Sequence, residues 1–108
     1  MARAPVRFGR LDDSVPPAGE TFVDLARVGS ARVEHIVSSA AADPAEQVQD
    51  SDEWVLVIAG SAELEVDGRA HRMAPGDWVM LPAGTPHRVV RTDAGTQWIA
   101  VHGPAPLP

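Results

Sequence analysis

One hairpin signal constrains the fold of this chain more than any other feature of its sequence. The segment Ala62–Val66 alternates between apolar and acidic residues and ends at Asp67-Gly68. Both central residues of a two-residue type I′ turn need φ > 0, which Asp and Gly tolerate well. The chain then returns through Arg69–Met73. The pattern predicts two antiparallel strands, the first with its apolar residues facing inward and its two glutamates facing outward.

Similar short segments, separated by turn residues, fill most of the remaining chain. Ten prolines and nine glycines interrupt 108 residues too often for long helices. Thr21–Val28 fits a short strand and a helical turn equally well. The other predicted strands are Ala31–Ser38, Glu53–Ala59, Trp78–Leu81, His87–Thr92 and Thr96–His102. Strands this short, with turns between them, predict an all-β double-sheet jelly roll or small barrel.

The length of the chain allows one domain with one hydrophobic core. We expect this domain to span residues 21–103, after an N-terminal arm over residues 1–20 and before a Pro-rich tail over residues 104–108. Two interpretations of the arm stay open, because its basic start suits a solvated tail and also a segment that docks on a partner subunit.

A homodimer is expected from the outer face of the Glu53–Ala59 segment. Its outward residues are Trp54, Leu56 and Ile58. A chain this short has few elements left to cover such a face, and an exposed apolar patch usually marks an interface.

The charge balance argues against two classes of partner. Fifteen acidic residues outnumber nine basic residues, all of them arginine, which gives a formal net charge of −6. We therefore expect no nucleic acid and no anionic membrane as a partner. The sequence has no cysteine, which excludes disulfides and thiolate metal sites. Its first residues hold no apolar run long enough for a signal peptide or membrane span, so the expected location is cytoplasmic.

The residues best suited to chemistry are Glu53 and His87, each at the start of a predicted strand. Glu53 begins the pattern Glu53-x6-Gly60. His87 ends the pattern Gly76-x5-Pro82-x-Gly84-x2-His87. A small barrel would bring the starts of these two strands together, so the candidate site is placed there.

These patterns resemble the two motifs of the cupin superfamily, over roughly residues 32–102. The second motif is complete except at its last position, where the family often has Asn and this chain has Arg91. The chain looks most like small single-domain bacterial cupins with a Gln before an acidic "DEW" run and a late Trp-x-Ala-Val-His strand. Here these are Gln49, Asp52-Glu53-Trp54 and Trp98–His102.

The resemblance implies a cupin-type double-stranded β-helix with a divalent metal inside the barrel. In the family, the metal is bound by two histidines and the Glu of the first motif and by the His of the second. Glu53 and His87 are retained here, whereas the two histidines fall on Gln47 and Gln49. An amide oxygen binds Fe, Ni or Zn more weakly than imidazole does.

His102 shares a predicted face with Trp98 and Ala100 and is the candidate for a further strong ligand. The metal set is therefore Gln49, Glu53, His87 and His102, for Fe, Mn, Ni or Zn. A metal-free alternative stays open, in which His87 is hydrogen-bonded to Glu53. Arg91, four positions after His87, would then neutralise Glu53 or bind a carboxylate or phosphate ligand.

Three functions follow from these alternatives. The first is a metal-dependent oxygenase, isomerase or lyase acting on a small molecule, with Glu53 as a ligand or as the group that moves a proton. The second is a metal-free module in which Arg91, His87, Gln47 and Gln49 bind a small anion. The third is a structural cupin without a ligand. The fold does not decide among them, and the substrate stays undefined.

Overall fold

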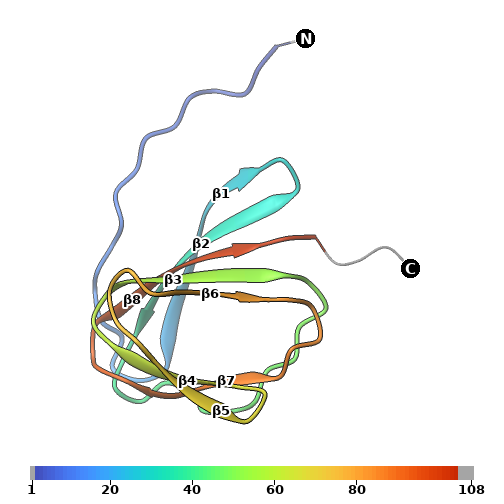
Figure 1. Ribbon diagram of the computed structural model, residues 1–108. Coiled ribbons are helices and arrows are strands. Elements are labelled where there is room, and N and C mark those ends of the chain that lie inside the picture. Colours follow the sequence, from blue (N-terminus) through green and yellow to red (C-terminus); the bar gives the residue numbers. More distant parts are fainter. Residues whose placement is uncertain (1, 105–108) are drawn as a thin grey trace.

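The computed structural model describes residues 2–104, which form eight strands and no helix (Figure 1). Residues 105–108 of the predicted Pro-rich tail lie outside this described part. The strands are β1 (Glu20–Val28), β2 (Ala31–Ser38), β3 (Glu53–Ala59), β4 (Ala62–Val66), β5 (Arg69–Met73), β6 (Trp78–Leu81), β7 (His87–Thr92) and β8 (Thr96–His102). The all-β prediction is confirmed.

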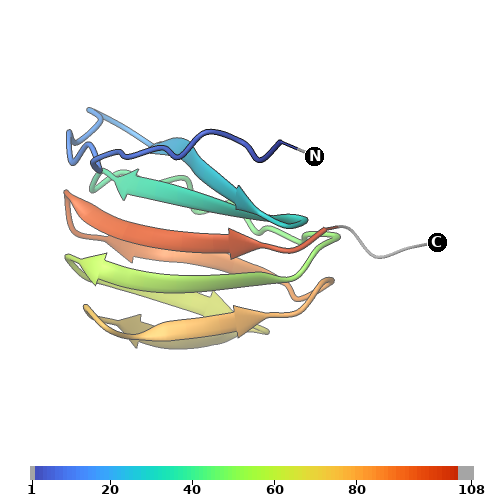
Figure 2. The same ribbon diagram turned by 90° about the horizontal axis from the view of Figure 1, so that it is seen from above.

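The strands form two antiparallel sheets that pack against each other. The larger sheet has the order β1-β2-β8-β3-β6, and the smaller has the order β5-β4-β7. Figure 2 shows the order of the larger sheet from above, from β2 through β8 and β3 to β6. In Figure 1, β4, β5 and β7 lie beneath this sheet and close the barrel. The arrangement is the predicted jelly roll.

Pairing with a neighbouring strand determines the conformation of the one segment that fitted a strand and a helical turn equally well. Thr21–Val28 belongs to β1, which pairs with β2 from Glu20 opposite Ser38 to Val28 opposite Ala31. The ladder is interrupted by a bulge between Asp24 and Ala26. Because β2 supplies these backbone hydrogen bonds, the segment is a strand and not a helical turn.

The core lies between the two sheets, and the inward faces predicted from alternation fill it. Ala62 and Leu64 of β4 are buried, as predicted. Across from them, the larger sheet contributes Ile36, Val55, Val57, Leu81, Trp98 and Ala100. The hairpin turn between β4 and β5 also has the expected backbone, with φ of 50° at Asp67 and 80° at Gly68.

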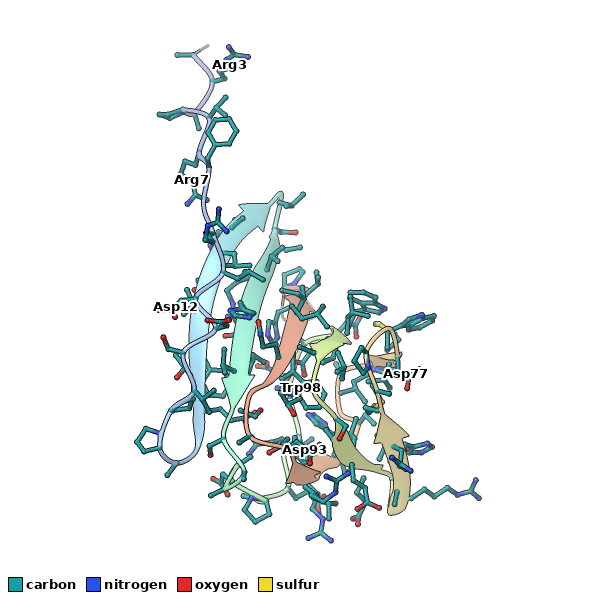
Figure 3. The ribbon with its side chains drawn as sticks, turned by 90° about the vertical axis from the view of Figure 1, so that its left-hand side faces the viewer. Arg3, Arg7, Asp12, Asp77, Asp93 and Trp98 are labelled. Atoms are coloured by element: carbon teal, nitrogen blue, oxygen red, sulfur yellow. The ribbon has the colours of Figure 1, made fainter. Side chains whose placement is uncertain are left out.

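The residues before β1 form an extended segment without regular structure up to Pro16. Figure 3 shows this segment running along the β1–β2 hairpin and continuing past its end. Its contacts are sparse. The Arg7 Nη2 group donates a hydrogen bond to the Leu25 carbonyl oxygen at 3.1 Å, and the Phe8 side chain is almost fully exposed. Within residues 2–104, no helix has the length and hydropathy needed to cross a membrane.

Candidate functional site

Glu53 and His87 face each other between the two sheets, as their motif positions predict. Glu53 is the first residue of β3 in the larger sheet, and His87 is the first residue of β7 in the smaller sheet. The distance from His87 Nε2 to Glu53 Oε1 is 3.9 Å, and both side chains are about nine-tenths buried. This distance is too long for a hydrogen bond, so the direct bond expected in the metal-free alternative is not formed.

One hydrogen bond on the other side of the ring fixes the orientation of His87. Its Nδ1 atom lies 2.9 Å from the Thr85 carbonyl oxygen. A carbonyl oxygen can only accept, so Nδ1 carries the hydrogen and the neutral ring keeps its lone pair on Nε2, the atom that faces Glu53. Metal-binding histidines are commonly held by a bond of this kind to a backbone carbonyl.

His102 lies next to Glu53, but its ring nitrogen is already engaged. His102 Nε2 is 3.0 Å from Glu34 Oε1 and 3.6 Å from Glu53 Oε2. Carboxylates accept hydrogen bonds, so Nε2 donates to Glu34 and has no lone pair to offer a metal. The other oxygen of Glu34 accepts a hydrogen bond from Arg32 at 2.9 Å. His102 Nε2 thus donates to Glu34 and lies just beyond hydrogen-bonding distance of Glu53.

Glu34 is the residue of this cluster that sequence reasoning missed. Alternation placed Glu34 on the same face of its strand as Ile36, but it did not show that this face points inward. The inward direction follows from pairing with β8, where Arg32 lies opposite His102 and Glu34 lies opposite Ala100. The presence of Ile36 on the face of Glu34 is the one sequence signal that could have suggested it.

The environment of Glu53 makes its carboxyl group easier to protonate. Burial raises the pKa of Glu53 above its usual value of 4.5, while the neighbouring His102 and His87 lower it and Glu34 raises it again. A carboxyl group with a raised pKa can hold and release a proton near neutral pH more readily than an exposed one.

Both glutamines of the altered first motif reach the cavity next to Glu53. Gln47 is paired with His87 through two backbone hydrogen bonds, of 2.7 and 3.0 Å. The Gln49 carbonyl oxygen accepts a hydrogen bond from the Gly84 N–H group at 2.8 Å. These contacts attach the loop before β3 to the start of β7 and its preceding turn. Both glutamines thus line the cavity, but the Gln47 side chain is exposed and donates a hydrogen bond from Nε2 to the Ala45 carbonyl oxygen at 3.4 Å.

Arg91 does not face the cavity, so the prediction that it lies on the face of His87 is wrong. Glu63 of β4 pairs with Arg91, but the next residue, Leu64, pairs with Val89. This bulge reverses the alternation of β7 after Val89. As a result, Arg91 is exposed and forms an ion pair with Asp93 at 2.8 Å, and it neither neutralises Glu53 nor reaches a ligand in the cavity.

The cavity beside Glu53 and His87 has a volume of about 320 Å³. Its walls combine apolar side chains with several polar and charged residues, as is usual for small-molecule sites. The apolar walls come from both sheets and consist mainly of Ile36, Val55, Leu64, Leu81, Val89 and Trp98.

The arrangement places two possible ligands of a divalent ion near each other. Two ligand atoms at tetrahedral positions, with bonds of about 2.0–2.2 Å to the ion, lie roughly 3.4 Å apart. Glu53 Oε1 and His87 Nε2 lie 3.9 Å apart, so they would have to approach each other by about 0.5 Å to bind one ion. Within residues 2–104, no group of three or more His, Cys, Asp or Glu side chains is arranged to hold an ion. Further ligands would have to be amide oxygens, such as that of Gln49, or water.

Known protein sequences are similar to this chain over most of its length. The cupin domain model matches residues 32–102. The quercetin 2,3-dioxygenase of Bacillus subtilis is 33% identical over 82 residues, which cover 74% of this chain and only 23% of that enzyme. This chain therefore spans less than a quarter of the length of that relative.

Solved structures extend the similarity over the whole barrel. A Ralstonia eutropha protein provisionally assigned as a mannose-6-phosphate isomerase is 38% identical, with a TM-score of 0.78 over 93% of this chain and 100% of that chain. KdgF from Halomonas sp. is 21% identical, with a TM-score of 0.74 over 82% of this chain and 81% of that chain, which shows a shared fold. The motifs, the barrel and these matches together establish that the chain belongs to the cupin domain family.

Proposed function

We propose that this protein binds a small organic molecule in the barrel cavity, next to a weakly held divalent ion. The observation that supports this most directly is the buried pair of Glu53 and His87, which face one cavity while the Thr85 carbonyl holds the His87 lone pair toward Glu53. A carboxylate and an imidazole 3.9 Å apart leave room for a third partner between them, either an ion or a water molecule.

In this proposal, Glu53 and His87 hold the ion and Gln49 contributes an amide oxygen. Imidazole and carboxylate ligands suit Fe, Mn, Ni and Zn. An ion at this position would polarise an oxygen atom of the bound molecule. Glu53 also has a raised pKa, so it is the residue that would hold or move a proton during a reaction.

The relatives support an enzyme but do not agree on a reaction. The Bacillus protein is named as a dioxygenase of quercetin, and the Ralstonia protein is provisionally assigned as an isomerase of a sugar phosphate. We therefore propose a metal-dependent oxygenase, isomerase or lyase as the reaction class and carry over neither substrate.

A metal-free binding module is the second candidate function. It is supported by the glutamines at the two histidine positions of the first motif and by the engagement of His102 with Glu34. The sequence suggested that such a module would bind a small anion through Arg91. This role of Arg91 is excluded, because Arg91 is paired with Asp93 outside the cavity.

Metal binding distinguishes the two candidates. Protein purified without added metal would be analysed for its elements and then titrated with Mn²⁺, Ni²⁺ and Zn²⁺. We expect partial occupancy that rises with added metal in the wild type, no rise in His87→Ala, and a normal rise in the control His71→Ala, which removes an exposed histidine of β5. A wild-type protein that stays empty at millimolar metal would contradict the first candidate.

A further inference from the structure

The cavity is elongated, and Glu53 marks only one of its ends. Glu53 of β3 lies opposite His102, the last residue of β8. Glu20 of β1 lies opposite Ser38 of β2, and Ser38 lies opposite Thr96, the first residue of β8. Six residue steps of β8 separate His102 from Thr96, which is about 20 Å at about 3.3 Å per residue. Glu20 and Glu53 both line the cavity, and Trp98, labelled in Figure 3, lies between their levels in its wall.

The Glu20 carboxylate is held in place by two buried neighbours. Trp98 Nε1 donates a hydrogen bond to Ser38 Oγ at 2.9 Å, and the Ser38 hydroxyl donates to Glu20 Oε2. In the described part of the chain, no donor pairs with the second oxygen, Oε1. The far end of the cavity thus presents an oriented hydrogen-bond acceptor that the protein itself leaves open.

Negative charge dominates the polar lining of the cavity. Glu20, Asp43 and Glu53 all line it. Arg88 is the single arginine of its lining among residues 2–104, and its guanidinium is bound through Nε and Nη2 to both oxygens of Glu65, at 3.2 and 3.0 Å. With no metal ion bound, a carboxylate or phosphate in this cavity would meet like charges without a free arginine, which disfavours burial of an anion.

We propose that the ligand is a neutral or cationic molecule with an apolar body and a hydroxyl or amino group that donates a hydrogen bond to Glu20, and that the cavity excludes anions. The apolar body would contact the walls around Ile36, Leu64 and Trp98. This inference rests on the proposed function of the cavity as a ligand site, and it adds the chemical class of the ligand.

Three probes of similar size and different charge test the proposal. p-Phenylphenol, p-phenylbenzylamine and p-phenylbenzoate share a biphenyl body and carry a neutral donor, a cationic donor and an anion. Their affinities would be measured by titration calorimetry at pH 8 in the presence of a chelator. The chelator makes the result independent of metal binding, so failure of this inference and failure of the metal site are distinguishable.

We expect p-phenylphenol and p-phenylbenzylamine to bind at least tenfold more tightly than p-phenylbenzoate. In Glu20→Gln the preference for the amine over the benzoate should shrink several-fold, whereas the control Asp13→Asn, which removes an exposed carboxylate of the N-terminal segment, should keep it. Equal or tighter binding of p-phenylbenzoate by the wild type would overturn the proposal, and so would failure of all three probes to bind at millimolar concentration. The wild-type comparison decides the question even if Glu20→Gln does not fold.

Discussion

His87 Nε2 and Glu53 Oε1 lie 3.9 Å apart, although the two residues begin strands in different sheets. The separation exceeds a hydrogen bond and is about 0.5 Å longer than that between two ligand atoms at tetrahedral positions around one ion. Each of the two side chains has a further polar neighbour. The Thr85 carbonyl holds the His87 ring, and the His102 ring lies 3.6 Å from the other oxygen of Glu53. The second cupin motif is thus retained up to His87, whereas the first has glutamine at both of its histidine positions.

Restoring one lost histidine should strengthen metal binding. Gln49 lines the cavity beside Glu53, and imidazole is a stronger ligand than an amide oxygen for Ni²⁺ or Zn²⁺. We expect Gln49→His to lower the Kd for Ni²⁺ at least tenfold in a calorimetric titration. The matched control is Val48→His, which adds a histidine at the exposed neighbouring position. An unchanged affinity in Gln49→His would show that this loop position does not reach the ion.

Glu20 should make the protein less stable as the pH rises. Burial raises the pKa of Glu20 above its usual value of 4.5, the hydrogen bond from Ser38 lowers it, and the charges of Glu34 and Asp43 raise it. Because the folded-state pKa is the higher one, the stability contributed by this group is complete below the unfolded-state pKa. It is lost as the pH rises through the folded-state pKa.

The variant Glu20→Gln removes this loss and keeps an acceptor for Ser38. Urea unfolding at pH 4 and at pH 8 should show that the difference in unfolding free energy, variant minus wild type, becomes more positive at pH 8. Asp13→Asn, in the exposed N-terminal segment, controls for the change in net charge. A difference that stays constant or falls between the two pH values would contradict the assignment.

Most of the fold could be read from the sequence because its turns are chemically explicit. Asp67-Gly68 and the glycines near the strand ends define where strands begin and end, so the bounds predicted for β2 to β8 agree with the structure. Alternation then identified the inward residues of β4 and β8. The position of Glu53 and His87 followed from the motif spacing, since the family places these two residues in one cavity.

The errors at the site come from pairing between strands, which local patterns do not contain. The bulge in β7 lies in a stretch without Gly or Pro, so nothing local indicated that Arg91 would turn outward. Glu34 became part of the site only through the register of β2 against β8. The engagement of His102 depends on Glu34, and it could not be predicted for the same reason.

The outer face of the larger sheet should bind a second copy of this chain. The rings of Trp54 and Trp78 lie 6.1 Å apart between their centroids, and Trp78 is 61% exposed, with the exposed Met80 nearby in the same strand. An apolar patch of this kind usually marks an interface. We expect a dimer at about 50 μM, since an interface of this kind should have a Kd in the low micromolar range or below.

Sedimentation equilibrium of two charge-introducing variants tests the dimer. Trp78→Glu should weaken association at least tenfold, because it places a carboxylate in the apolar patch. Val90→Glu introduces the same charge at an exposed position of β7 in the other sheet and should leave the dimer intact. A wild-type protein that sediments as a monomer, or a dimer equally weakened by both variants, would count against this face.

Gly60, the last residue of the first motif, should be irreplaceable for steric reasons. Its φ is 80°, and a Cβ atom added there would lie 2.5 Å from Thr96 Oγ1 and 2.6 Å from Thr96 Cα. Thr96 is fully buried, and its hydroxyl lies within hydrogen-bonding distance of the carbonyl oxygens of Ser61 and Asp93. It cannot move aside without breaking these contacts.

Gly68 provides a matched control for this effect, because its φ is also 80° but an added Cβ atom would meet nothing within 4 Å. Gly68→Ala should therefore cost only the strain of a left-handed backbone, about 1–2 kcal/mol of unfolding free energy. Gly60→Ala should cost about 2 kcal/mol more, since it adds a steric overlap in a packed interior. Urea unfolding of both variants measures the difference. Equal losses would mean that the sheet relaxes around the added methyl group and that backbone conformation alone requires the glycine of the first motif.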